Sequence, residues 1–163
     1  MSDRLRAQLA TRIRTRSPRD WPEFCSLWMA FNAIYQGEPD ARERARLMAS
    51  IRGNFTETSA RRVLRASTAS IKNILSIPPG NLLLNRWDPN FRAASLRYAA
   101  MYRNKSETAV GRLAAVAAVL YQVRCNLVHG SKDPSVPRDR MLVAESVAVL
   151  RSLVPALEAA AEA

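Results

Sequence analysis

Apolar side chains recur along most of the chain at steps of three and four residues, which is the spacing of one face of an α-helix. The clearest stripe lies within residues 20–36 and consists of Phe24, Leu27, Trp28, Phe31, Ile34 and Tyr35. Valine, isoleucine and threonine form no alternating run of the kind that indicates a strand. The pattern therefore predicts an all-α protein.

Proline and glycine divide this pattern into separate helices, because each interrupts or ends a helical backbone. The predicted helices cover residues 3–16, 20–36, 39–53, 57–75, 91–102, 106–129 and 139–160. Residues 77–90 are dense in Pro, Gly and Asn, which predicts a loop insertion. The 163 residues fit one helical domain over residues 1–163, in which residues 1–19 form a basic N-terminal helix or arm.

The inserted loop is unusually apolar, since it contains Leu82, Leu83, Leu84 and Trp87. These side chains are expected either to pack down as a lid over the core or to meet a partner. Trp87, like the other two tryptophans, is expected in the core by default.

The formal net charge of +11 predicts attraction to polyanions, with nucleic acid as the first candidate. The alternative is a biased genome composition, since only three of the 25 basic residues are lysines. Five arginines are candidates for contact with an RNA backbone, the alternative for each being an ordinary solvated face: Arg61, Arg62, Arg65, Arg97 and Arg103.

Several classes of site are excluded by residue counts. Cys25 and Cys125 lack the spacing of a zinc site or a disulfide framework, and their apolar helical contexts predict reduced, buried thiols. A single histidine, His129, rules out sites that need two within one chain. No metal or cofactor is expected. The absence of a signal-peptide core or an apolar run of about 18 residues predicts a cytoplasmic protein with no membrane contact.

The segment YQVRCNLVHG, residues 121–130, carries the candidate chemistry. Arg124 lies on the apolar seam of a helix, where a permanent charge needs a partner or a function. His129 follows about 7.5 Å further along the axis. An arginine can hold a phosphate while a histidine transfers protons, and Asn126 could orient either group. The alternative is structural: Arg124 pairs with a carboxylate and His129 simply caps the helix.

This segment resembles the HEPN family, whose hallmark is an arginine followed by four to six residues and a histidine near a helix end. The string FCSLWMAFNAIYQG, residues 24–37, is similar to a helix seen in a subgroup of these proteins. The two strings cover about 24 residues and stand in the family's order. The usual polar residue directly after the arginine is replaced by Cys125, and Asn126 comes next.

The resemblance implies an up-and-down helical bundle that forms a symmetric homodimer, with the Arg-His motifs meeting across the twofold axis. Many such domains are metal-independent endoribonucleases in toxin–antitoxin or antiviral defence, and some are restrained by a nucleotidyltransferase antitoxin. Carried over, Arg124 binds the scissile phosphate and His129 transfers protons. Asn32 and Tyr121 are expected to reach the region of Arg124 and help to position it. The alternative is that Asn32 is a core amide and Tyr121 a core aromatic residue.

Three hypotheses follow from the sequence. The first is a HEPN endoribonuclease acting on RNA. The second is a non-catalytic HEPN module that dimerises and binds RNA, a nucleotide or a protein partner. The third is an unrelated helical protein that binds nucleic acid.

Overall fold

The computed structural model describes residues 7–8, 10–11, 18–35 and 43–162, and these form seven helices and no strand. The helices are α2 (Asp20–Ile34), α3 (Glu43–Asn54), α4 (Glu57–Ala66), α5 (Thr68–Ser76), α6 (Ala93–Arg103), α7 (Ala109–Val128) and α8 (Pro137–Ala161). The all-α prediction is confirmed. Most of the predicted helix over 3–16 and the predicted start at residues 39–42 lie outside the described residues.

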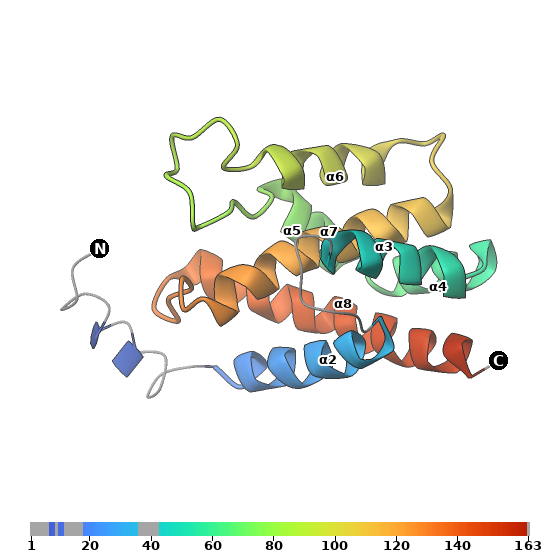
Figure 1. Cartoon of the computed structure of the whole chain (residues 1–163), viewed down its shortest axis with the longest axis horizontal. Helices are drawn as coiled ribbons and strands as arrows, with labels where there is room; N and C mark the ends of the chain where they lie inside the picture. The colour runs from blue at the N-terminus through green and yellow to red at the C-terminus, as the bar shows by residue number, and fades with distance from the viewer. Residues whose placement is uncertain (1–6, 9, 12–17, 36–42, 163) are drawn as a thin grey trace.

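Helix α7 is the centre of the bundle and packs against α3, α4, α6 and α8 (Figure 1). Its side chains are buried around most of the helix, with alanines at 114, 115, 117 and 118. A helix that is apolar on all sides belongs in a core, and small side chains let its neighbours approach closely. The chemistry-bearing segment 121–130 is therefore anchored by the best-buried element of the fold.

The helices α6, α7 and α8 alternate in direction, whereas α2 lies beside α8 and runs in the same direction (Figure 1). The predicted aromatic stripe of α2 is confirmed as its buried face. Phe31 contacts Trp28 and Tyr35 edge to face, each at 5.2 Å between ring centroids. Burial of each large apolar side chain contributes about 1.5–3 kcal/mol, so this face fastens α2 to the bundle.

The predicted single helix over 57–75 was wrong in one respect, because the backbone breaks at Ser67 between α4 and α5. The Thr68 hydroxyl donates to the carbonyl oxygens of Leu64 at 2.8 Å and Arg65 at 3.2 Å. Ser and Thr hydroxyls that compete for helix carbonyls commonly bend or end the ladder. The bend changes the direction of the chain without a loop.

The segment between α5 and α6 contains no helix, as predicted, but its apolar tip does not form a lid. Leu83 and Trp87 are 67 % and 78 % exposed, and Leu82 is also exposed. Only the base of the loop packs down, and a side chain on Gly80 would collide with the Phe91 ring. The partner alternative for the loop tip stays a prediction.

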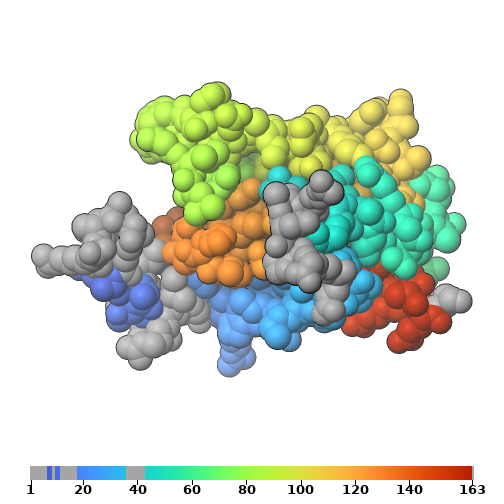
Figure 2. Space-filling view, in the orientation of Figure 1, coloured from blue at the N-terminus to red at the C-terminus, as the bar shows by residue number. Residues whose placement is uncertain are grey.

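The prediction of two buried thiols was wrong for Cys25, which is exposed on α2, while Cys125 is half-buried. No helix in the described part of the chain is long and apolar enough to cross a membrane. In the space-filling view, the end of α7 and the turn after it reach the surface between the 77–92 segment and α2 (Figure 2).

Candidate functional site

The backbone around His129 is held by a Schellman motif at the end of α7. Gly130 adopts φ = +64°, its N–H donates to Leu127 O at 3.0 Å, and the Ser131 N–H donates to Asn126 O at 2.9 Å. A left-handed glycine directly after the helix allows this pattern, which satisfies the last carbonyl groups. His129 is the C-cap residue itself, and its side chain is exposed. The imidazole therefore projects into solvent from a fixed backbone.

Arg124 lies one turn earlier, beside a carboxylate from another helix. Its Nη1 is 3.8 Å from Oε2 of Glu43 at the start of α3, and its side chain is 27 % exposed. Charge-assisted hydrogen bonds are about 2.7–2.9 Å long, so the guanidinium is attracted to Glu43 without being fully engaged. A guanidinium has five N–H donors, which leaves Arg124 with donors for a second anion.

Two phenols hold the Glu43 carboxylate from the other side. The Tyr35 hydroxyl donates to Oε1 at 3.1 Å, and the Tyr121 hydroxyl donates to Oε2 at 3.0 Å. Burial, together with the charge of Glu43, raises the pKa of Tyr35 well above its usual range. Burial is also the main cause that raises the pKa of Tyr121. Both phenols therefore act as protonated donors, and Tyr121 supports Arg124 through Glu43.

The Arg124 guanidinium stays charged in this setting. Burial works to lower its pKa, but the attraction of Glu43 together with the effects of Cys125 and Tyr121 outweighs burial, so the pKa is raised above its ordinary value. A permanent cation with partial exposure suits a group that binds phosphate.

Asn126 has a different role from the expected one. It is 2 % exposed, and its Nδ2 donates to Gly80 O at 2.8 Å. Its Oδ1 accepts from the Leu82 N–H at 3.1 Å and from Gln122 Nε2 at 3.2 Å. The expectation that Asn126 orients a phosphate or the imidazole does not fit this geometry, because the amide is occupied in fastening the loop base to α7.

Arg124 and His129 are not joined by a hydrogen bond or ion pair within the described chain. Five helical residues separate them by about 140° around the axis, so one protomer presents the two groups on different faces. The carboxylate of Glu43 beside Arg124 and the C-cap position of His129 match the structural alternative, in which Arg124 pairs with a carboxylate and His129 caps the helix. Asn32 is half-buried on α2, and no described contact links its amide to Arg124.

A cavity of about 510 Å³ lies next to this network and is lined in part by Tyr98, Tyr121 and Met48. The Arg44 guanidinium lies 5.0 Å from the Tyr121 ring centroid and 5.9 Å from that of Tyr98. Its Nη2 donates to Gln122 Oε1 at 3.0 Å. The aromatic and cationic lining continues the Arg124 site toward α6.

A buried ion pair fixes the segment that follows His129. Lys132 is 3 % exposed, and its Nζ lies 2.6 Å from Oδ1 of Asp139 in the first turn of α8. Burial nevertheless lowers the pKa of Lys132. Among the described residues, no group of three His, Cys, Asp or Glu side chains is placed to hold a metal ion.

The five arginines expected to contact RNA do not form one surface. Arg61, Arg62 and Arg65 lie together on the exposed face of α4. Arg97 is exposed on α6 over the Tyr98 ring. Arg103 donates from Nη2 to Leu75 O at 2.6 Å and so caps the end of α5, which gives its guanidinium a structural partner.

Glu43 organises the whole Arg124 network, and the sequence pattern gave no sign of it. Its contacts come from α2 and α7, and Tyr121 lies 78 residues away along the chain. No local spacing signals such a contact. The buried position of Arg124 predicted a carboxylate partner but not its identity.

Comparison with known proteins found no family model, no curated protein and no solved structure that matches the chain.

Proposed function

We propose that the chain is a metal-independent endoribonuclease of HEPN type that acts in the cytoplasm as a symmetric homodimer. The observation that carries the proposal is the placement of the motif at the end of α7. Arg124 is a partly exposed cation with spare donors, and His129 is an exposed imidazole on a fixed backbone. A phosphodiester in solvent can reach each of these groups, and a dimer would bring them to one site.

The proposed reaction uses the RNA's own 2′-hydroxyl as nucleophile. The 2′-oxygen attacks phosphorus while an imidazole accepts its proton, and the bond from phosphorus to the 5′-oxygen breaks as that oxygen receives a proton. The products are a 2′,3′-cyclic phosphate and a 5′-hydroxyl. Arg124 stabilises the additional negative charge that develops on the phosphoryl oxygens.

A homodimer would resolve two features of the single chain. One histidine cannot serve as base and acid at the same instant, whereas two symmetry-related copies of His129 can. A twofold axis near the end of α7 would also bring Arg124 of one protomer toward His129 of the other. This arrangement does not require the two groups to meet within one chain.

A second candidate function is a non-catalytic HEPN module that dimerises and binds RNA, a nucleotide or a protein such as a nucleotidyltransferase antitoxin. The observation that favours it is the internal use of motif residues. Arg124 already has Glu43 within 3.8 Å, and the amide of Asn126 is committed to the 77–92 segment. In this reading the motif stabilises the fold.

The deciding experiment is incubation of purified protein with single-stranded RNA in EDTA. Wild-type protein is expected to generate cyclic-phosphate ends. His129→Ala and Arg124→Ala are each expected to slow cleavage by about a hundredfold or more. Val128→Ala is the matched control, because it removes an exposed side chain adjacent to His129 without removing a titratable group.

Circular dichroism and thermal melting separate chemistry from folding. A folded His129→Ala protein that cleaves at the wild-type rate would overturn the nuclease proposal. Absence of cleavage by wild type, together with RNA binding, would select the non-catalytic module. Light scattering gives the oligomeric state, and a monomer at working concentration would remove the composite site.

A further inference from the structure

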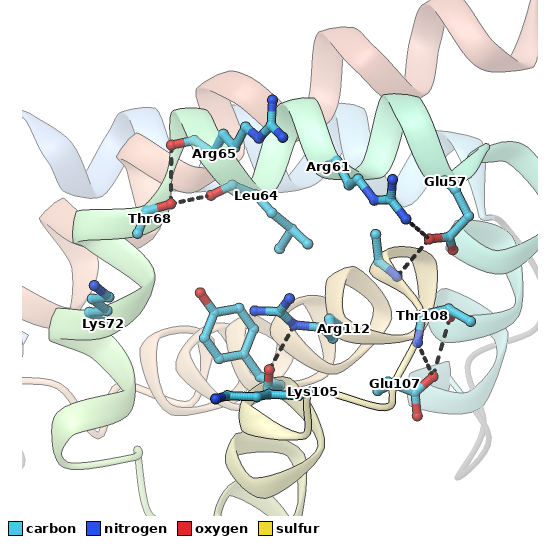
Figure 3. A pocket seen from close by; sticks show the side chains of 12 residues that line it. Glu57, Arg61, Leu64, Arg65, Thr68, Lys72, Lys105, Glu107, Thr108 and Arg112 are labelled. Carbon is cyan, nitrogen blue, oxygen red and sulfur yellow. Dashed lines mark hydrogen bonds and ion pairs between the residues drawn. The ribbon is translucent and has the colours of Figure 1, made fainter.

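A second basic site lies at the opposite end of α7 from the Arg124–His129 motif. It is a groove of about 590 Å³ between α4, α5 and the connection from α6 into α7 (Figure 3). Five basic side chains line it: Arg61, Arg65, Lys72, Lys105 and Arg112. Arg112 precedes Arg124 by twelve helical residues, or about 18 Å of helix axis, so the groove is a separate site.

Three of these cations have no carboxylate partner among the described residues. Arg65, Lys72 and Lys105 are exposed, and no ion pair within the described chain involves them. The sequence contains a signal for this wall, because residues 61, 65, 68 and 72 recur at helical spacing. The opposite wall comes from residues 102–112 and is brought there by the packing of α4 on α7.

The other two cations are held in place by the fold. Arg61 lies 3.5 Å from Glu57 within α4. Arg112 donates from Nε to Tyr102 O at 2.8 Å, and its guanidinium lies 4.9 Å from the Tyr102 ring centroid. Arg112 thus presents a positioned charge at the floor of the groove with only one of its five donors used.

The two carboxylates that border the groove are engaged by the protein itself. Glu57 accepts the N–H groups of Ala109 at 2.9 Å and Val110 at 3.1 Å, so it caps the start of α7. Glu107 accepts the backbone N–H of Thr108 at 3.1 Å and its hydroxyl at 3.3 Å. Both negative charges are drawn toward backbone donors, and the groove keeps an excess of positive charge.

The groove continues along α4 rather than closing around a small ligand. Arg61, Arg62, Arg65 and Thr58 line an adjoining depression of about 400 Å³. Tyr102 is only 9 % exposed beneath Arg112, so it offers no open face for base stacking. An elongated cationic track without an aromatic platform fits a phosphodiester backbone better than a nucleobase.

We propose that this groove is a second RNA site, which grips the phosphodiester backbone of a single strand independently of base sequence. The inference rests on the proposed function for its choice of polyanion. In this proposal, phosphates are bound by four side chains of the groove, Arg65, Lys72, Lys105 and Arg112. The Arg124–His129 motif acts on a different part of the same strand. The groove contributes affinity, and the motif contributes chemistry.

The test measures binding of labelled single-stranded RNA in EDTA by fluorescence anisotropy, with His129→Ala as the starting protein so that the RNA stays intact. To this protein we add Arg65→Gln, Lys72→Gln and Lys105→Gln together. For single-stranded RNA, each phosphate contact contributes about 0.7 to the slope of log affinity against log salt concentration. Removing one contact makes that slope shallower by the same amount. The triple variant is expected to bind ten- to a hundredfold more weakly at 0.1 M salt, with a slope shallower by about 2.

The matched control removes the same charge elsewhere, with Arg19→Gln, Arg86→Gln and Arg140→Gln, all exposed residues outside the groove. It is expected to change affinity less than threefold. Equal weakening by both triples, or no binding of RNA by the starting protein, would overturn the groove proposal. Should the triple variant fail to fold, Lys105→Gln alone must reduce the slope by about 0.7.

The outcomes distinguish this inference from the nuclease proposal. If wild type does not cleave but the groove triple still reduces binding, the groove stands and the catalytic proposal fails. If wild type cleaves and the groove triple leaves both binding and the KM for cleavage unchanged, the motif stands and the groove fails. If the groove triple lost binding to an acidic protein partner while its RNA binding stayed unchanged, the ligand of the groove would be that partner rather than RNA.

Discussion

Polar and charged side chains beside the two ends of α7 are in opposite situations. Near its C-terminal end, Arg124 lies by Glu43, and Asn126 makes three hydrogen bonds in the protein interior. Near its N-terminal end, Lys72 and Lys105 face a groove without carboxylate partners among the described residues. Folding therefore engages Arg124 and Asn126 at one end and leaves Lys72 and Lys105 at the other end free to act on an external ligand.

The largest expected contrast is in stability. Asn126→Ala leaves the Gly80 carbonyl and the Leu82 N–H without a partner in a buried site, which should lower the free energy of unfolding by about 1–3 kcal/mol. Arg65→Ala, in the groove, should change it by less than about 0.5 kcal/mol. Urea denaturation measures both changes in the free energy of unfolding, provided that the dependence of this free energy on urea concentration is the same in each variant. Similar losses for the two variants would erase the contrast.

A second prediction concerns the backbone that supports His129. Gly130→Ala places a Cβ at φ = +64° and should destabilise the protein by about 1 kcal/mol. Gly53→Ala is the control, since its Cβ would meet nothing within 4 Å at the end of α3, and it should be neutral or stabilising by up to about 1 kcal/mol. Thermal melting shows whether each variant raises or lowers the melting temperature. A stabilising Gly130→Ala would contradict the assigned turn.

A third prediction tests the carboxylate that holds Arg124. Glu43→Gln keeps the side-chain shape but leaves one oxygen acceptor in place of the two that Tyr35 and Tyr121 use, and it removes the negative charge, so both phenols should titrate at lower pH. Ultraviolet titration of the four tyrosines measures the change. Because the Arg124 pair is long and partly exposed, the loss of stability should stay below about 1 kcal/mol.

Glu158→Gln, on the exposed side of α8, is the control for that titration and should leave it unchanged. An identical tyrosine titration in Glu43→Gln and wild type would mean that Glu43 does not organise the site in solution.

The smallest effect is expected at the groove end. Hydrogen bonds from the N–H groups of Ala109 and Val110 lower the pKa of Glu57 below its ordinary value of 4.5. A carboxyl whose folded pKa is lowered stabilises the protein above its unfolded pKa, and this contribution disappears as pH falls through the folded pKa. Glu57→Gln should therefore lose less stability than wild type between pH 5 and the acid limit of folding.

Urea denaturation at a series of pH values measures that difference, with Glu158→Gln again as the control. Parallel pH profiles for wild type and Glu57→Gln would show that Glu57 does not cap α7. In that case its charge would count against the positive excess of the groove.

The sequence alone predicted the local features of the site. Helical periodicity placed the apolar face of α2 and the extent of α7, and Gly130 marked the end of α7. These depend on steps of three or four residues and on backbone sterics, which neighbouring residues determine. The break at Ser67 was missed because a helical pattern continues through it, and hydroxyl competition for carbonyls is a weak signal.

Local patterns along the chain were enough to predict most of the helices, the excess of positive charge and the positions of Arg124 and His129 along one helix. Packing of the helices was needed to show that Glu43 lies beside Arg124, that Asn126 holds a distant loop, and that residues 102–112 form the wall facing the α4 cations. Helix formation is governed by short-range steric and hydrogen-bond rules. Contacts between remote side chains depend instead on how whole helices pack, which no local spacing specifies.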